Sequence, residues 1–185
     1  HRVRFLRNVI GLWLIQECRR HWASQGTEYS YAELKIMAAE AEPFAHTIDP
    51  DDERFFLPED MPAEIAGFCL ETGQPEPTTH GAMARCILES LALLYRQRIN
   101  DLSSLTGRNF SRLHVIGGGS RNDLLNQFTA DALGIPIIAG PSEATALGNV
   151  VAQALAMRKI SSLEEARRRI AESSDLRTFQ PRNTE

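Results

Sequence analysis

The segment from residue 113 to residue 149 constrains the fold of this chain more than any other. It opens with a short apolar run that ends in three glycines, continues in a helical pattern, and then repeats an apolar run followed by a second helical pattern. We expect strands at 113–116 and 135–139, and helices that open at Ser120 and Glu143. This order of elements predicts an α/β fold in which a glycine turn joins the first strand to its helix.

The glycine turn consists of Gly117, Gly118 and Gly119. Because glycine has no Cβ, such a turn adopts positive φ and lets a phosphate or a flat ring approach the backbone to contact distance. Asn122 falls in the first turn of the expected helix, where its amide can face the same ligand. Ser120 and Asp123 match the pattern of a capping box. The pattern fits either a nucleotide-binding turn or a plain strand-to-helix turn.

Two common nucleotide-binding motifs are excluded here. No Lys follows the glycines, so the turn is not a GxxxxGK[ST] phosphate loop, and there is no GxGxxG pattern with an acidic ribose partner at the usual spacing. A nucleotide site at this turn would therefore belong to a third kind of fold.

The composition is that of a globular protein and argues against several classes of partner. With 185 residues, of which 43% are hydrophobic, the chain is long enough for one domain with a core. A net charge of −4 argues against a nucleic-acid surface. No apolar run reaches the ~20 residues of a membrane span, and no signal peptide is recognisable. Because the chain begins at His1 within a helical pattern, we expect a piece of a longer protein.

The three cysteines are Cys18, Cys69 and Cys86, an odd number without CxxC spacing. Zinc binding and a secreted disulfide framework are therefore poorly supported, and a cytoplasmic location is expected. Cys69 and Cys86 lie in expected helices joined by a proline-rich turn, which makes them candidates for a disulfide. Buried free thiols are the favoured alternative, since bridges are uncommon in the cytosol.

The first residues predict an amphipathic helix over 2–22. Asn8 and Gln16 would lie on one face of it, because their separation corresponds to about two helical turns. Their two amides could then look into the same cleft.

Further helices are expected at 30–42, 62–72, 79–104 and 162–173, and the apolar helix over 143–157 is expected to be buried on most sides. Residues 43–61 are expected to form an ordered surface loop. Its acids fit a solvated turn better than a metal site, because oxygen-ligand loops need a defined Gly and a distal Glu. These acids are Asp49, Asp51, Asp52 and Glu53.

Four stretches carry a resemblance to a known family: RNVIGLWLIQ at 7–16, IDPDDERFFLPEDMPAEI at 48–65, ARCILESLALLYRQ at 84–97, and the run 113–149. Together they resemble the C-terminal domain of the FGGY family of carbohydrate kinases, over nearly the whole chain. Such kinases transfer the γ-phosphoryl group of ATP to a sugar hydroxyl.

The resemblance implies an actin-like, ribonuclease-H-like α/β fold that is rich in helix and has a short sheet. The domain would cover residues 1–175, with 43–61 as a surface loop and 176–185 as a tail. The family's domain opens with a short β-meander, whereas this chain begins at the helix that follows it. The sheet would therefore have an open edge, which favours pairing with another copy or with a missing segment.

The resemblance also assigns roles to single residues. Gly118, within the turn 117–119, would lie against the adenosine part of ATP, and Asn122 and Gln16 would also contact the nucleotide. Asn8 would contact the ketose. Mg²⁺ would be held mainly through the nucleotide and the absent N-terminal domain. Because that domain also supplies the catalytic Asp, no catalytic residue is expected here, and the chain alone should not phosphorylate sugar.

Two alternatives stay open at this point. The chain could come from a kinase of the same family for any of several sugars, because Asn8 alone does not name the substrate. It could also be a non-catalytic, actin-like binding module that uses its sheet edge as an interface.

Overall fold

The computed structural model describes residue 6 and residues 8–182. The chain forms two compact units, the first up to Leu102 and the second from Ser103 onwards. Each unit has its own arrangement of elements.

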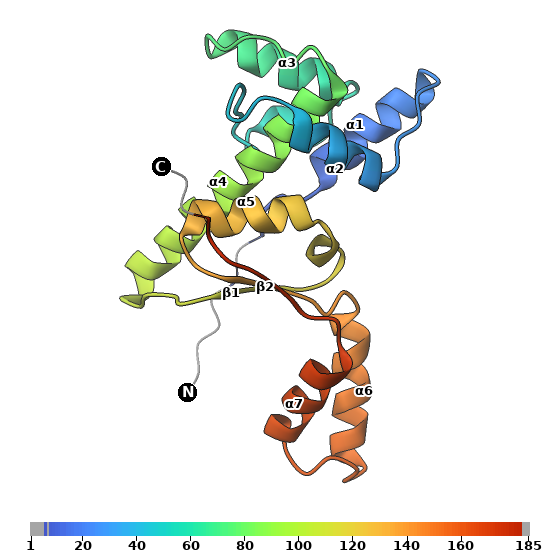
Figure 1. The fold of residues 1–185 in the computed structure, drawn as a ribbon, viewed down its shortest axis with the longest axis vertical. Helices are drawn as coiled ribbons and strands as arrows, with labels where there is room; N and C mark the ends of the chain where they lie inside the picture. The colour runs from blue at the N-terminus through green and yellow to red at the C-terminus, as the bar shows by residue number, and fades with distance from the viewer. Residues whose placement is uncertain (1–5, 7, 183–185) are drawn as a thin grey trace. The chain divides into compact units, whose positions relative to one another are not determined.

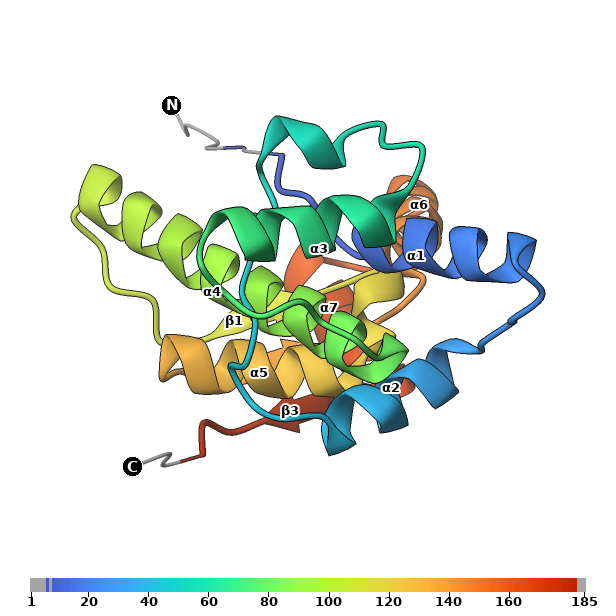
Figure 2. The ribbon, with the colours of Figure 1, turned by 90° about the horizontal axis from the view of Figure 1, so that it is seen from above.

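The first unit is helical. It contains α1 (Trp13–Ser24), α2 (Tyr31–Glu40), the short 3-10 helix η1 (Glu53–Phe55), α3 (Met61–Glu71) and the long helix α4 (His80–Thr106), whose last residues pass into the second unit. Helices α1 and α3 pack against each other (Figure 2). The fully buried side chains of this unit include Leu14, Phe55, Met61, Ile65, Ile87, Leu88 and Leu91.

Two helices of this unit begin directly after a residue whose side chain caps the helix. Ser30 accepts the N–H of Glu33 at 3.2 Å, and the Glu33 carboxylate accepts the N–H of Ser30 at 2.7 Å. This completes the expected capping box at the start of α2. Asp60 accepts the N–H of Ala63 at 2.9 Å and caps α3.

The helix expected over 2–22 is wrong over residues 8–12. α1 begins only at Trp13, and Asn8 precedes it in irregular backbone; residues 2–5 and 7 lie outside the described residues. The segment before α1 contains Val9, Ile10 and Gly11, which have low helix propensity, and Leu12 offers no side-chain cap. Asn8 and Gln16 therefore do not share a helix face.

The second unit is built on a three-stranded sheet (Figure 1). β1 (Leu113–Val115) runs parallel to β2 (Ile137–Ala139), and β3 (Arg177–Phe179) runs antiparallel to β2. α5 (Asp123–Leu133) packs against the sheet and buries Leu125 and Ala130. The expected α/β order of strand, glycine turn, helix and strand is confirmed.

β3 falls within the segment expected to be a tail. Ile137 pairs with Phe179 and Ala139 with Arg177, so this segment completes the sheet. A run of three residues is too short to show strand periodicity, and the free edge of β2 supplies the backbone groups that pair with it.

The last two helices, α6 (Ala144–Ala156) and α7 (Leu163–Ser173), lie side by side (Figure 1). The expectation that α6 is buried on most sides is wrong: none of its residues is buried, and Val150 is 62% exposed. Small apolar residues make a helix compatible with close packing, but they do not themselves provide a partner for every face.

Candidate functional site

The glycine turn leaves the sheet at the end of β1. Gly117 has φ 77°, in the left-handed region that side chains disfavour, and its N–H donates to the carbonyl oxygen of Pro141 at 3.1 Å. The turn then tightens into the 3-10 helix η2 (Gly118–Arg121). The carbonyl oxygen of Gly117 accepts both the N–H and the hydroxyl of Ser120, at 3.1 and 2.7 Å. The sharp turn is therefore held by contacts between Gly117 and Ser120 and by one bond to Pro141, which follows β2.

Gly118 and Gly119 present their backbone to open space. A Cβ built on Gly118 would meet no atom within 4 Å, and one built on Gly119 would meet only a Val115 methyl group at 4.0 Å. Gly118 is also exposed, and its φ lies outside the left-handed region. Packing within the described residues therefore does not require glycine at position 118, whereas the close approach of a ligand would.

Asn122 is the N-cap of α5. Its Oδ1 accepts the N–H of Leu125 at 3.0 Å, and its own carbonyl oxygen accepts the N–H of Asn126 at 3.0 Å. This differs from the expected capping box at Ser120, because the 3-10 turn delays the helix until Asp123. Asn122 is half-buried at the end of the glycine turn.

Gln16 lies in the first unit, on the N-terminal half of α1, and its side chain is exposed. It lines a surface hollow of about 640 Å³. The other lining residues are Arg19, Arg20, Ala23, Glu28, Tyr29, Ser30 and Glu33. The hollow is large enough for a small ligand and carries charges of both signs.

The two arginines of this hollow already have partners. Arg19 donates to the carbonyl oxygen of Tyr29 at 2.8 Å, and its guanidinium lies 4.1 Å from the centre of the Tyr31 ring. Arg20 pairs with Glu17. Neither arginine was predicted as a site residue, although their spacing of three and four residues from Gln16 on a helix places all three on one face.

The expected site residues fall into two groups. Asn8 and Gln16 belong to the first unit, where Asn8 is exposed ahead of α1. The turn 117–119 and Asn122 belong to the second unit and are contiguous there.

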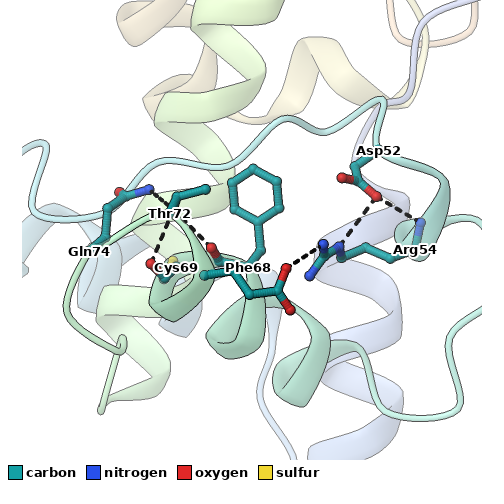
Figure 3. A network of polar contacts seen from close by, with 7 residues as sticks. Asp52, Arg54, Phe68, Cys69, Thr72 and Gln74 are labelled. Atoms are coloured by element: carbon teal, nitrogen blue, oxygen red, sulfur yellow. Dashed lines mark hydrogen bonds and ion pairs between the residues drawn. The ribbon is translucent and has the colours of Figure 1, made fainter.

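The acidic loop is a structural turn. Asp49 accepts the N–H of Asp51 at 3.0 Å, while Asp52 accepts the N–H of Arg54 at 3.0 Å (Figure 3). Arg54 also lies over the ring of Phe68, at 5.2 Å from its centre. Within the part of the chain that the structure describes, no group of three or more His, Cys, Asp or Glu residues could hold a metal ion.

Cys69 and Cys86 face each other inside the first unit, where both are buried and free. A hydrogen bond between the two side chains lowers the pKa of Cys69, and the same bond together with burial raises the pKa of Cys86. Cys69 is seen in Figure 3 beside Thr72, whose hydroxyl donates to its carbonyl oxygen at 3.1 Å.

Among the described helices, none is long and apolar enough to cross a membrane.

The chain shares its fold with part of two solved kinases. The chain superimposes on the xylulose kinase from Rhodospirillum rubrum with a TM-score of 0.57 and 20% sequence identity, over 95% of this chain and 34% of that one. It superimposes on Plasmodium falciparum glycerol kinase, solved with ADP, with a TM-score of 0.61 and 18% identity, over 88% of this chain and 32% of that one. The expected actin-like fold is thereby confirmed.

The model of the FGGY family of carbohydrate kinases, C-terminal domain, matches residues 1–157, and the chain belongs to this family. Among its curated relatives are the rhamnulokinases of Bacteroides thetaiotaomicron, with 49% identity over 98% of this chain, and of Oceanobacillus iheyensis, with 42% over 97%. The rhamnulokinase of Bacillus subtilis is 40% identical over 98% of this chain. The chain spans only 36% to 37% of the length of these relatives.

Proposed function

We propose that this chain is the C-terminal, nucleotide-binding part of an ATP-dependent rhamnulokinase, which converts L-rhamnulose and ATP to L-rhamnulose 1-phosphate and ADP. The sequence identity of 49% to a relative of that name supports this choice of sugar. Kinases of this family use ATP, and Mg²⁺ would be held mainly through the nucleotide and the N-terminal part of the enzyme.

The exposed backbone at Gly118 is the observation that supports nucleotide binding at this turn. The left-handed Gly117 turns the chain sharply, so that the next peptide groups face open space at the end of a strand and ahead of a helix. A flat adenine or ribose can rest against such a surface without meeting a Cβ. Asn122 uses its Oδ1 to cap α5, so we assign its Nδ2 as the donor to the adenine.

Gln16 is proposed as a further ATP contact and Asn8 as a contact to the ketose. Both side chains are exposed and so are accessible to a ligand. The catalytic Asp is assigned to the N-terminal domain, so the isolated chain is expected to bind nucleotide weakly and to transfer no phosphoryl group.

The alternative sugars are xylulose, fuculose and glycerol. The structural likeness to a xylulose kinase and a glycerol kinase concerns the fold alone, since the identities are only 20% and 18%. Initial rates of the complete enzyme with each sugar would decide; a higher kcat/KM for xylulose, fuculose or glycerol than for L-rhamnulose would overturn the choice.

A non-catalytic binding module is the second candidate function. Within the described residues β1 pairs only with β2, so its other edge is open and could pair with another copy or with another segment. The cytoplasm is the proposed location, where ATP and a reduced state of the three thiols are both maintained.

The nucleotide site is tested by calorimetric titration of the chain with ADP. Gly118→Val places a branched side chain on the open surface, and Asn122→Ala removes the proposed donor. Gly148→Val is the matched control, because a Cβ at this helical glycine also meets no atom within 4 Å. We expect binding to be lost in the first variant, weakened in the second and kept in the control. If the folded wild-type chain does not bind ADP, the proposal that this chain binds nucleotide by itself fails.

A further inference from the structure

The carbonyl oxygen of Ser120 ends the glycine turn and is held from two sides. Asn126 donates to it from α5 through Nδ2 at 3.0 Å, and Arg177 donates to it from β3 through Nη2 at 2.9 Å. Ser120 and Asn126 are both buried. The end of the turn is therefore fixed by a neighbouring helix and by a strand more than fifty residues later in the sequence.

Arg177 also ties the turn to the helix that follows. Its Nη1 pairs with the carboxylate of Asp123, the first residue of α5. A guanidinium presents its donors in a rigid planar fork, so two contacts through different nitrogens fix its orientation. One side chain from β3 thus joins η2 to the N-terminus of α5.

The chain after Arg177 continues along the same face of α5. Gln127 donates through Nε2 to the carbonyl oxygen of Gln180 at 2.8 Å, and the N–H of Arg182 donates to Asp131 at 2.8 Å. Asp123, Gln127 and Asp131 succeed one another at helical i, i+4 spacing and lie on one face. The segment from Arg177 to Arg182 is therefore fastened to α5 at three successive turns.

We propose that Arg177 is a positioning residue for the nucleotide-binding turn, through which β3 holds Gly117, Gly118 and Gly119 in place. Consecutive glycines lose much conformational freedom when they are ordered. If the turn is already ordered before the ligand arrives, less of this entropy is lost when the ligand binds. The identity of the ligand rests on the proposed function, whereas the restraint on the turn does not.

The test measures the turn directly, by amide hydrogen exchange in NMR without nucleotide. Arg177→Gln removes the ion pair, and Arg182→Ala is the control, because Arg182 reaches α5 through its backbone N–H. In Arg177→Gln we expect the amides of Ser120 and Asn122 to exchange roughly tenfold faster or more, the range for loss of a charge-assisted hydrogen bond. The amides of the β1–β2 ladder should keep their protection, and Arg182→Ala should match the wild type at all of these positions.

A second variant and a ligand titration complete the test. Asp123→Asn removes the negative charge of the ion pair and should also speed amide exchange at Ser120. Arg177→Lys keeps a positive charge at position 177, so its turn amides should be better protected than those of Arg177→Gln. ADP should bind several-fold more weakly to Arg177→Gln than to the control. Unchanged turn amides in both Arg177→Gln and Asp123→Asn, or an equal rise at every amide, would overturn the positioning role. Absence of ADP binding by the wild type would instead contradict the proposed function.

Discussion

Arg85 and Glu89 form a buried ion pair one turn apart on α4, with Nε 2.7 Å from Oε1. They are only 8% and 2% exposed. The other oxygen of Glu89 accepts the N–H of Phe44 at 2.8 Å. Arg85 Nη1 donates to three carbonyl oxygens at the end of α2, those of Ala38, Ala39 and Ala41. The pair therefore joins α4 to the end of α2 and to the loop that follows.

Glu89→Ala should lower the free energy of unfolding by roughly 3–5 kcal/mol, because it removes the carboxylate from a buried ion pair and takes away the acceptor of the Phe44 N–H. Urea unfolding measures this change. Glu71→Ala is the control: it removes an ion pair with Arg54 in which Glu71 is largely exposed, and because exposed pairs contribute little, its effect should be much smaller. A loss in Glu89→Ala no larger than in the control would contradict the role of the pair.

Local signals predicted much of this fold. Ser30 and Glu33 are close enough in sequence to show their capping box, and the glycine triplet marks the turn after β1. β3 could not be foreseen in the same way, because its pairing depends on the edge of β2 rather than on its own short sequence. For the same reason the link from Arg177 to Ser120 has no local signature.

Helical spacing and apolar composition gave two wrong predictions, one for the segment around Asn8 and one for α6. The spacing of Asn8 and Gln16 fits a helix, but the weak helix formers before Trp13 prevent α1 from reaching Asn8. The apolar residues of α6 suggested burial, although composition does not identify the surface that would cover them. Gly118 could be proposed as a site residue from the sequence because its signal, the absence of a side chain, is local.

We expect the folded protein to lose stability in acid because of the surroundings of His80. It stacks on Trp22 with ring centroids 4.3 Å apart, and its Nδ1 lies 2.9 Å from the hydroxyl of Tyr29. Burial lowers its pKa from the usual 6.5, so below that pH the unfolded chain binds more protons than the folded one. The stability that neutral His80 contributes is complete above about pH 6.5 and is lost as the pH falls through the lower folded-state pKa.

Urea unfolding at a series of pH values from about 8 to about 5 tests this, since the slope of stability with pH reports the difference in bound protons. His80→Phe keeps an aromatic ring beside Trp22 and cannot titrate. His21, which lies 3.5 Å from Asp60, is present in both proteins and so cancels in the comparison. The wild type should lose more stability than the variant on acidification; equal slopes would rule His80 out as the cause.

The pKa of Glu165 should lie well below that of an ordinary carboxyl group. Hydrogen bonds from the hydroxyl and N–H of Ser161, and then from Arg169, lower its pKa to about 2. The carboxylate is thus favoured in the folded state, and the stability it gives α7 is present above the usual carboxyl pKa and lost as the pH falls through about 2. NMR titration of the side-chain carboxyl carbon measures this value. Ser161→Ala should raise the pKa more than Arg169→Ala does, and the reverse order would contradict the assignment.

Mild oxidation should join Cys69 to Cys86 and leave Cys18 reduced. The first two thiols are in hydrogen-bond contact, and the lowered pKa of Cys69 favours the thiolate that attacks an oxidised partner. All three thiols are buried, but burial and the nearby carboxylates of Asp60 and Glu17 raise the pKa of Cys18, so it is a poor nucleophile. A small oxidant such as diamide accepts the two hydrogens that the thiols lose when the disulfide forms.

Peptide mapping of the oxidised chain under denaturing, non-reducing conditions identifies the bridge. Cys18→Ala should give the same cross-linked peptide in the same yield, whereas Cys86→Ala should give none and leave Cys69 free to react with an alkylating reagent. Recovery of a Cys18 cross-link from the wild type would show that burial does not protect this thiol. Failure of Cys69 and Cys86 to couple under diamide would mean that their contact does not allow the geometry of a disulfide, which requires Cα atoms within about 7 Å.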